Sequence, residues 1–193
     1  SAGGSIGGTV SAPVFASASA LTHVTGTVTS ADGSVNVRAA GGNVTAAVNA
    51  GRDVSLFAYG DVQATVTAGQ DAHLLVMGTP SAPVTAGRNL HLTVHGTIPA
   101  AINPTAGKNA RVWSFGDIDA DVTATTGDAD VTTWGALTAS VNAGGYASLW
   151  SHGDADVTVN SGDFSSLRTY GTAAIEINAG LDAYVWAGKE VTG

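Results

Sequence analysis

Aspartates at alternate positions of one short stretch could bind a cation or carry out acid–base catalysis. A β-strand would place Asp117, Asp119 and Asp121 on the same side, because side chains alternate along a strand. Oxygen ligands gathered in this way suit a hard cation such as calcium, and paired carboxylates serve polysaccharide-degrading enzymes. However, Val122 stands where a calcium loop requires glycine. We therefore expect a solvated acidic face, with no enzyme activity, no cofactor and no metal, and these three aspartates are the metal candidates to check.

Histidine offers a second possible metal site, but its spacing is less favourable. His73 and His91 are 18 residues apart, so in a repeating fold they would be stacked neighbours. No third ligand accompanies them, and a pair of surface histidines is the simpler interpretation. The sequence also shows no cysteine, no phosphate-binding loop and no Ser–His–Asp arrangement.

Aromatic residues occupy the outward-facing positions of a series of predicted strands, and all four tryptophans are among them. The candidate binding residues are Phe57, Tyr59, Trp113, Phe115, Trp134, Trp150, Tyr170 and Trp186. Equivalent positions of stacked strands form ladders, so we expect two adjoining aromatic stripes. The stripes could stabilise the sheet as ladders or be covered by a third strand or the amino-terminal segment. They could instead pack against another chain, such as a second copy, or stack on the sugar rings of a glycan.

The elements that would position these residues follow from a glycine period. Glycine recurs every nine residues from Gly33 to Gly96 and, after small insertions, again from Gly107 to Gly188. Every second glycine follows a small residue, usually alanine, so the unit is a coil of about 18 residues, which must stack on its neighbours to bury a core. We expect glycine to supply corners with positive φ between the strands.

Between the glycines, polarity alternates with a period of two, which predicts strands and excludes an amphipathic helix. The predicted core includes Leu90, Leu92 and Val94 in one half-coil and Val62 in the other, and it extends to Ala183 in the last coil. These observations predict an all-β fold, a right-handed parallel β-solenoid of about ten coils with two main strands per coil. We expect residues 1–32 to form an irregular lead-in or degenerate first coils, and residues 33–193 to form one elongated domain. We interpret the chain as a piece of a longer protein.

The second strand of each coil presents threonine and asparagine outward. These residues recur just before Ala-Gly, so we expect hydrogen-bonded ladders at that corner. A flat threonine face could instead order water, as in ice-binding solenoids, but few coils keep a Thr-x-Thr pair such as Thr65 and Thr67, and charged residues interrupt the face elsewhere.

Composition limits the partners. Only 11% of the 193 residues are charged and the net charge is −8, which disfavours nucleic acid and anionic membrane surfaces, because both attract basic patches. No apolar run approaches the length of about 20 residues that a membrane span needs. The lack of cysteine fits either a reducing compartment or an exported bacterial protein, and we favour export.

Three segments carry a resemblance to a known family: residues 50–56 (AGRDVSL), 86–92 (AGRNLHL) and 179–185 (AGLDAYV). They resemble the repeats of filamentous haemagglutinin-type β-solenoids, and the similarity covers most of residues 33–193. The resemblance implies a noncatalytic structural or adhesive stalk segment of a large bacterial surface protein outside the cell. The alternatives are a module that binds carbohydrate or protein through the aromatic face, a polysaccharide-degrading β-helix enzyme, and an ice-binding solenoid.

Overall fold

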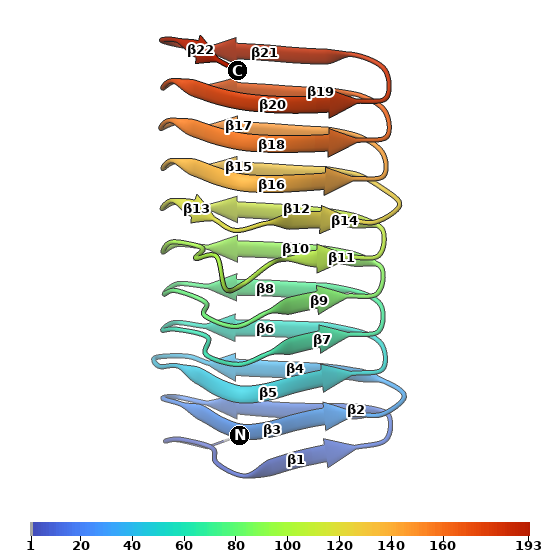
Figure 1. The fold of residues 1–193 in the computed structure, drawn as a ribbon. Coiled ribbons are helices and arrows are strands. Elements are labelled where there is room, and N and C mark those ends of the chain that lie inside the picture. Colours follow the sequence, from blue (N-terminus) through green and yellow to red (C-terminus); the bar gives the residue numbers. More distant parts are fainter. Residues whose placement is uncertain (1) are drawn as a thin grey trace.

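The computed structural model describes residues 2–193, which wind into a β-solenoid of about ten turns (Figure 1). Two parallel sheets run along the rod, one with 12 strands and one with 10. The strands of one sheet run to the right in front and those of the other run back behind them as the chain rises, so the coil is right-handed (Figure 1). The predicted fold class is confirmed.

Each coil contributes strands to both sheets. The 12-stranded sheet, called here the polar sheet, contains β1 (Thr9–Ala12), β3 (Val24–Ser30), β5 (Val44–Ala50), β7 (Val66–Ala68), β9 (Val84–Ala86), β11 (Thr105–Ala106), β13 (Ile118–Asp119), β14 (Val122–Ala124), β16 (Leu137–Ala143), β18 (Ala155–Ser161), β20 (Ala173–Ala179) and β22 (Val191–Thr192). The 10-stranded sheet, called the aromatic sheet, contains β2 (Phe15–Ala20), β4 (Ser34–Ala39), β6 (Val54–Ala58), β8 (Ala72–Val76), β10 (Asn89–Val94), β12 (Asn109–Ser114), β15 (Ala129–Thr133), β17 (Ala147–Ser151), β19 (Ser165–Thr169) and β21 (Ala183–Ala187).

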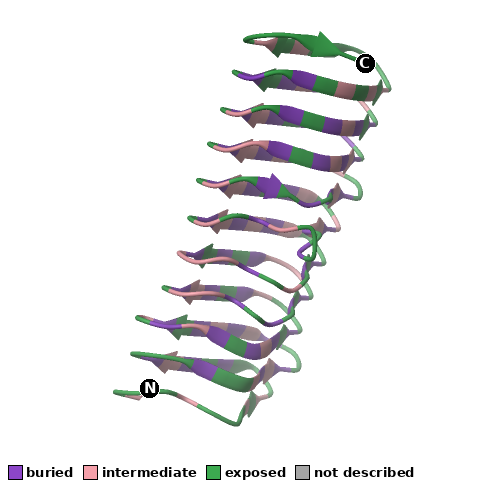
Figure 2. Ribbon diagram, turned by 60° about the vertical axis from the view of Figure 1, so that its left-hand side comes forward, coloured by how far each residue is buried: buried purple, intermediate pink, exposed green. Residues whose placement is uncertain are grey.

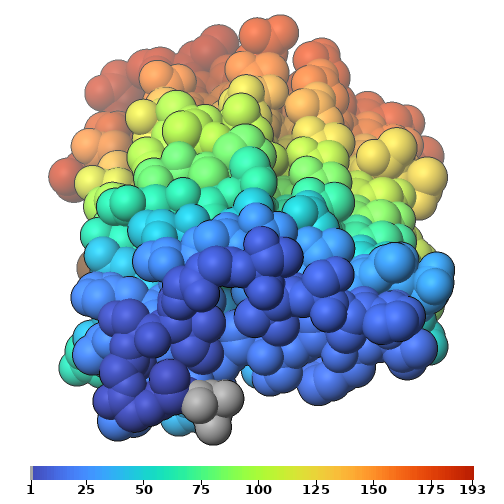
Figure 3. All heavy atoms as spheres, turned by 90° about the horizontal axis from the view of Figure 1, so that it is seen from below, coloured from blue at the N-terminus to red at the C-terminus, as the bar shows by residue number. Residues whose placement is uncertain are grey.

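The register between coils follows the repeat. Val54 pairs with Ala72, 18 residues later, whereas Asn89 pairs with Asn109, 20 residues later, because an insertion lengthens that coil. Strands β1, β2 and β3 lie within residues 1–32 and pair in parallel with the strands that follow. Figure 3 looks along the rod from below, with the amino-terminal coils nearest and the later coils behind them.

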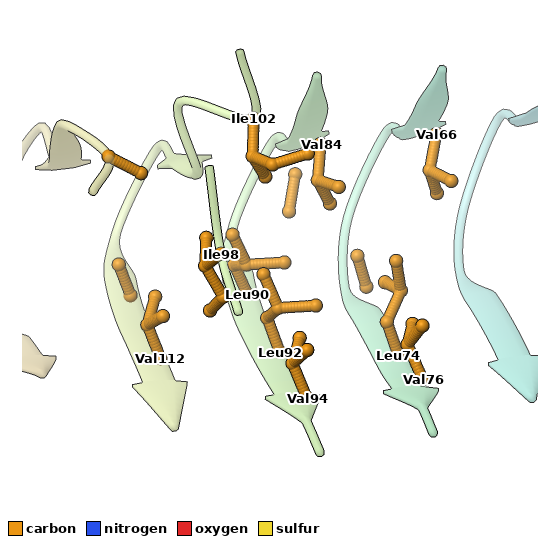
Figure 4. Packing of buried hydrophobic residues seen from close by; sticks show 14 of the residues in the cluster. Val66, Leu74, Val76, Val84, Leu90, Leu92, Val94, Ile98, Ile102 and Val112 are labelled. Atoms are coloured by element: carbon orange, nitrogen blue, oxygen red, sulfur yellow. The ribbon is translucent and has the colours of Figure 1, made fainter. Parts of the chain in front are cut away.

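The core is a thin layer of aliphatic side chains between the two sheets. Along the strands, buried and exposed residues alternate (Figure 2). Leu90, Leu92 and Val94 of β10 point toward Ile98 and Ile102 of the facing half-coil (Figure 4), and all five are at most 2% exposed. Alanine and valine fill most remaining inward positions, which lets the sheets approach closely.

The last coil departs from the predicted core. Ala183 is exposed, although the alternation assigned it to the interior. The reason is that it packs against the preceding coil alone, while Ile175 and Val185 are partly buried at the edge of the cluster.

The explanation predicted for the corner glycines is wrong. Among the described residues, the glycines with positive φ are Gly8 and Gly26, and neither belongs to the regular series. At the corners of the regular series, glycine is required because the coils approach each other closely. A Cβ built on Gly69 would lie 2.2 Å from the carbonyl oxygen of Gly51, and one built on Gly87 would lie 2.2 Å from the carbonyl oxygen of Gly69. Each corner rests on the corner below with no space for a side chain.

Candidate functional site

The eight aromatic candidates all lie on the outer face of the aromatic sheet or at the corner that follows it. Four lie within strands, namely Phe57, Trp113, Trp150 and Trp186, and four directly follow strands, namely Tyr59, Phe115, Trp134 and Tyr170. Inward-facing neighbours are aliphatic or small, so alternation turns the rings away from the core. We call this surface the aromatic face.

Most of these rings are open to solvent. Tyr59 is 60% exposed, Trp134 51% and Tyr170 41%, while Trp113 and Trp150 are half-buried by their neighbours. The hypothesis that an amino-terminal segment covers the face does not hold for the described residues, because residues 9–30 build β1, β2 and β3 instead.

Register places the strand aromatics in one column along the rod. Trp113 pairs with Thr132, Thr132 with Trp150, Trp150 with Arg168, and Arg168 with Trp186. We call these five positions the tryptophan column. Tryptophan therefore occupies every second rung, with a polar residue on each rung between.

A second column, at the corner, packs beside the first. Trp134 and His152 stack with ring centroids 5.6 Å apart and planes 18° apart, and His152 stacks on Tyr170 at 5.2 Å and 29°. Trp150 meets this stack edge-on, at 73° to Trp134 and 78° to Tyr170, and Trp186 lies at 77° to Tyr170. Such edge-to-face pairs contribute about 0.5–1.5 kcal/mol each beyond burial, so they hold the rings in place.

Arginines complete the aromatic face at two points. The Arg168 guanidinium lies 5.2 Å from the ring centroid of Tyr170 and 5.0 Å from that of Trp186, and it donates a 3.0 Å hydrogen bond to the Tyr170 hydroxyl. Arg38 lies 5.3 Å from the ring of Phe57. These cation–π contacts fix flexible side chains on the surface.

Two of the three aspartates named as metal candidates accept hydrogen bonds from the backbone. The Asp117 carboxylate accepts a 2.8 Å hydrogen bond from the backbone N–H of Ala136, and Asp121 accepts one of 3.0 Å from Ser140. Asp119 is exposed on β13 beside Thr138. Within residues 2–193, no three His, Cys, Asp or Glu side chains lie close enough together to hold a metal ion.

The same arrangement recurs along the corner that follows the aromatic sheet, and the sequence reasoning missed it. Asn43, Asp61 and Asp154 each follow a glycine, and each accepts the backbone N–H of the equivalent residue one coil later, at 3.0, 2.9 and 2.8 Å. This bond lowers the pKa of the Asp154 carboxyl. The signal that could have revealed these bonds is the recurrence of Asp or Asn directly after the glycine.

Asp71 belongs to the other corner and is the most strongly perturbed carboxylate. It accepts hydrogen bonds from Arg88, in a bidentate ion pair with an Nε–O distance of 2.9 Å, and from the side chain of Asn89. Arg88 and then Asn89 lower the pKa of Asp71 to about 2, against the partial burial that would raise it. Asp71, like Asp61 and Asp154, therefore joins neighbouring coils.

The expected ladder is confirmed for asparagine on the polar sheet, whereas no hydrogen bond joins its outward threonines to one another in residues 2–193. The side-chain amide of Asn160 donates to Asn142 at 3.0 Å, and that of Asn178 donates to Asn160 at 3.1 Å. A further ladder lies inside the coil, where the buried hydroxyls of Ser114, Thr133 and others hydrogen-bond to glycine backbone atoms at the corner. The alternation in the sequence places these Ser and Thr residues on the inward side of their strands, but their hydrogen bonds were not predicted.

His73 and His91 are neighbours, as the repeat predicts, with ring centroids 5.8 Å apart. Burial and, secondarily, the charge of His73 lower the pKa of His91. The pair lies beside Arg111 and Asp130, whose ion pair has an Nε–O distance of 3.2 Å.

Removing calcium should leave folding unchanged, because the corner carboxylates are satisfied by backbone N–H groups rather than by a cation. We expect the thermal midpoint, followed by circular dichroism, to agree within error in excess calcium and in excess chelator. Magnesium chloride at equal ionic strength is the control for screening. A midpoint that falls markedly on chelation would contradict this assignment.

Comparison with known protein families, curated proteins and solved structures finds no match for this chain. In the part of the chain that the structure describes, no helix is long and apolar enough to span a membrane.

Proposed function

We propose that this chain is a noncatalytic structural and adhesive segment of an exported bacterial surface protein, in the manner of filamentous haemagglutinin-type stalks. The observation that carries the proposal is the aromatic face: a rigid rod holds exposed aromatic rings in fixed register over many coils. A patch of this kind exceeds what a monomer usually exposes without an interaction role.

The rod form supports the structural part of the proposal. Each coil is joined to the next by two ladders of backbone hydrogen bonds and by Asp or Asn side chains at the corners. An array joined in this way transmits force along its axis and spaces binding groups evenly. The cysteine-free composition and the repeat motifs support export.

Replacing Trp113 and Trp150 by Ser should preserve the fold and weaken adhesion. Both rings lie outside the core, so circular dichroism and the thermal midpoint should change little, while the loss of two aromatic anchors should lower retention of protein-coated beads on polysaccharide and protein surfaces at least about tenfold. The matched control replaces Thr93 on β10 and Ser148 on β17 by Ala, because both face outward and neither carries an aromatic ring. Unchanged bead retention by a folded double variant, or release of sugar fragments from the polysaccharide surface by the unaltered protein, would contradict the proposal.

The second candidate is a module that binds carbohydrate or protein in solution rather than at a surface. The openness of Trp134 and Tyr170 favours it. It differs from the first candidate in requiring tight binding by a single soluble segment, whereas an adhesin can use weak contacts repeated along the rod.

A further inference from the structure

The period of the tryptophan column is the most specific feature of the aromatic face. Trp113, Trp150 and Trp186 lie on alternate rungs of one register, with Thr132 and Arg168 between them. Neighbouring strands of a sheet are about 4.8 Å apart, so successive tryptophans of the column lie about 9.6 Å apart along the rod. The column is therefore a row of regularly spaced aromatic platforms.

The neighbouring stack fixes Trp150 and Trp186, while Trp113 packs edge-on against Phe115 with ring centroids 4.3 Å apart. The ring planes of Trp134, His152 and Tyr170 are nearly parallel, with angles of 18° and 29° between successive rings. Their centroids are 5.6 and 5.2 Å apart, which is too close for rings lying side by side in one plane. The three rings therefore stack face to face along the rod. Trp150 and Trp186 stand at 69° to 78° to members of this stack. Their planes consequently run along the rod rather than across it. A ligand that stacks on them would lie along the axis, on rings that lose little freedom when it binds.

The polar rungs supply hydrogen-bonding groups between the platforms. The Arg168 guanidinium is held between Tyr170 and Trp186, and in the described chain it makes no ion pair, unlike Arg88 and Arg111. Its remaining N–H groups and the Thr132 hydroxyl can bond to hydroxyl groups or ring oxygens of a ligand.

We propose that the tryptophan column binds an extended, uncharged polysaccharide of β-linked hexoses lying along the rod axis. This inference rests on the proposed adhesive function and names its ligand. In such a ribbon each sugar ring advances by about one rung and is turned over relative to the ring before it, so every second ring presents the same face. Alternate rings would stack on Trp113, Trp150 and Trp186, and the intervening rings would meet Thr132 and Arg168.

Charge favours an uncharged glycan over a second copy of the chain or a polyanion. Asp130, which pairs with Arg111, is the single acidic residue in the ten strands of the aromatic sheet, so the acidic groups of the chain are concentrated at the corners and on the polar sheet. Two copies, each with a net charge of −8, would repel as they approached. A polyanion requires a cluster of free cations, whereas Arg168 is the one cation in the tryptophan column and the nearby Arg111 is paired with Asp130.

Titration calorimetry with β-1,4-linked gluco-oligosaccharides of increasing length tests this inference. Affinity should rise with each added ring until the ligand spans the five rungs of the tryptophan column and should then level off. The α-1,4-linked oligosaccharides of equal length are the matched control, because their chain coils and cannot keep the two-rung period. Equal affinity for the two linkages, or no binding of the β-linked series, would overturn the inference.

A register swap separates the period from the mere number of tryptophans. The double change Thr132→Trp with Trp150→Thr keeps the composition but destroys the alternate spacing, and it should weaken binding of the five-ring β-linked ligand at least about tenfold. Phe15→Thr, which removes an exposed ring on β2 at the amino-terminal end of the rod, should leave binding unchanged. If circular dichroism shows that the swap disturbs folding, Trp186→Ala takes its place as the test. This change removes one platform and should also weaken binding. Full binding by a folded swap variant would overturn the inference.

The experiments distinguish a failure of this inference from a failure of the proposed function. If the oligosaccharides do not bind, yet bead retention falls in the Trp113 and Trp150 double variant, the face is adhesive toward something other than this glycan and only the present inference fails. If analytical ultracentrifugation shows that Trp150→Ser abolishes a dimer of the unaltered chain, the occupant is a second copy, and the glycan inference is overturned.

Discussion

Replacing Leu92 by Asp should unfold the middle of the rod. Leu92 is 0% exposed and pairs in register with Leu74 and Val112. Truncating a buried leucine costs about 2–5 kcal/mol, and an unpaired buried carboxylate adds a desolvation cost of several kcal/mol. We expect the free energy of unfolding, measured by urea titration with circular dichroism, to fall by at least about 4 kcal/mol.

The adjacent residue is the matched control. Thr93 lies on the same strand but faces outward, so Thr93→Asp introduces the same carboxylate without burying it and should change stability by less than about 1 kcal/mol. Because each coil contacts only its neighbours, the damage from Leu92→Asp should begin locally and broaden the transition. Equal midpoints for the two variants would show that the inward and outward assignments of β10 are mistaken.

The sequence was sufficient to assign most of the strands and their two faces, because the alternation is strict and nearly every inward position is small or aliphatic. Leu90, Leu92 and Val94 are core residues by this reasoning and in the structure. The outward position of Trp113 and Trp150 follows from the same alternation. What alternation does not contain is rotamer choice, and so the edge-on packing of Trp150 against Trp134 and Tyr170 was not predictable.

The role of the acidic residues shows a different limit. A pattern of alternate aspartates tells which side of a strand they occupy, but not which atom a carboxylate reaches. Asp117 and Asp121 accept backbone N–H groups of the next coil, and those donors are 19 residues away in sequence. Only the register between coils brings them together, and register depends on the insertions that lengthen individual coils.

The glycine period was read correctly as a repeat but explained by the wrong mechanism. Positive φ and close approach of backbones both demand glycine, and a sequence does not distinguish them. At Gly69 the structure does, because its φ is outside the left-handed region while its missing side chain faces the carbonyl group of Gly51.

Replacing Gly69 by Ala should therefore destabilise the rod although alanine can adopt the same backbone angles. The new Cβ would lie 2.2 Å from the Gly51 carbonyl oxygen and 2.9 Å from its carbon. Both atoms are backbone, so relief requires a shift of the corner against the coil below and strains the Gly69 N–H bond to the Ala50 oxygen, now 2.9 Å. Overpacking of this kind costs about 1–3 kcal/mol, measurable by urea titration with circular dichroism.

Gly4→Ala is the matched control, because a Cβ at Gly4 meets nothing within 4 Å. It should change the free energy of unfolding by no more than about 0.5 kcal/mol. The same test at Gly87, whose Cβ would approach the Gly69 oxygen equally closely at 2.2 Å, should reproduce the loss seen at Gly69, because the contact repeats from coil to coil. If Gly69→Ala and Gly87→Ala were as stable as Gly4→Ala, close approach between coils would not be the reason for the glycine period, and the spacing between the coils would have to be wider than the structure shows.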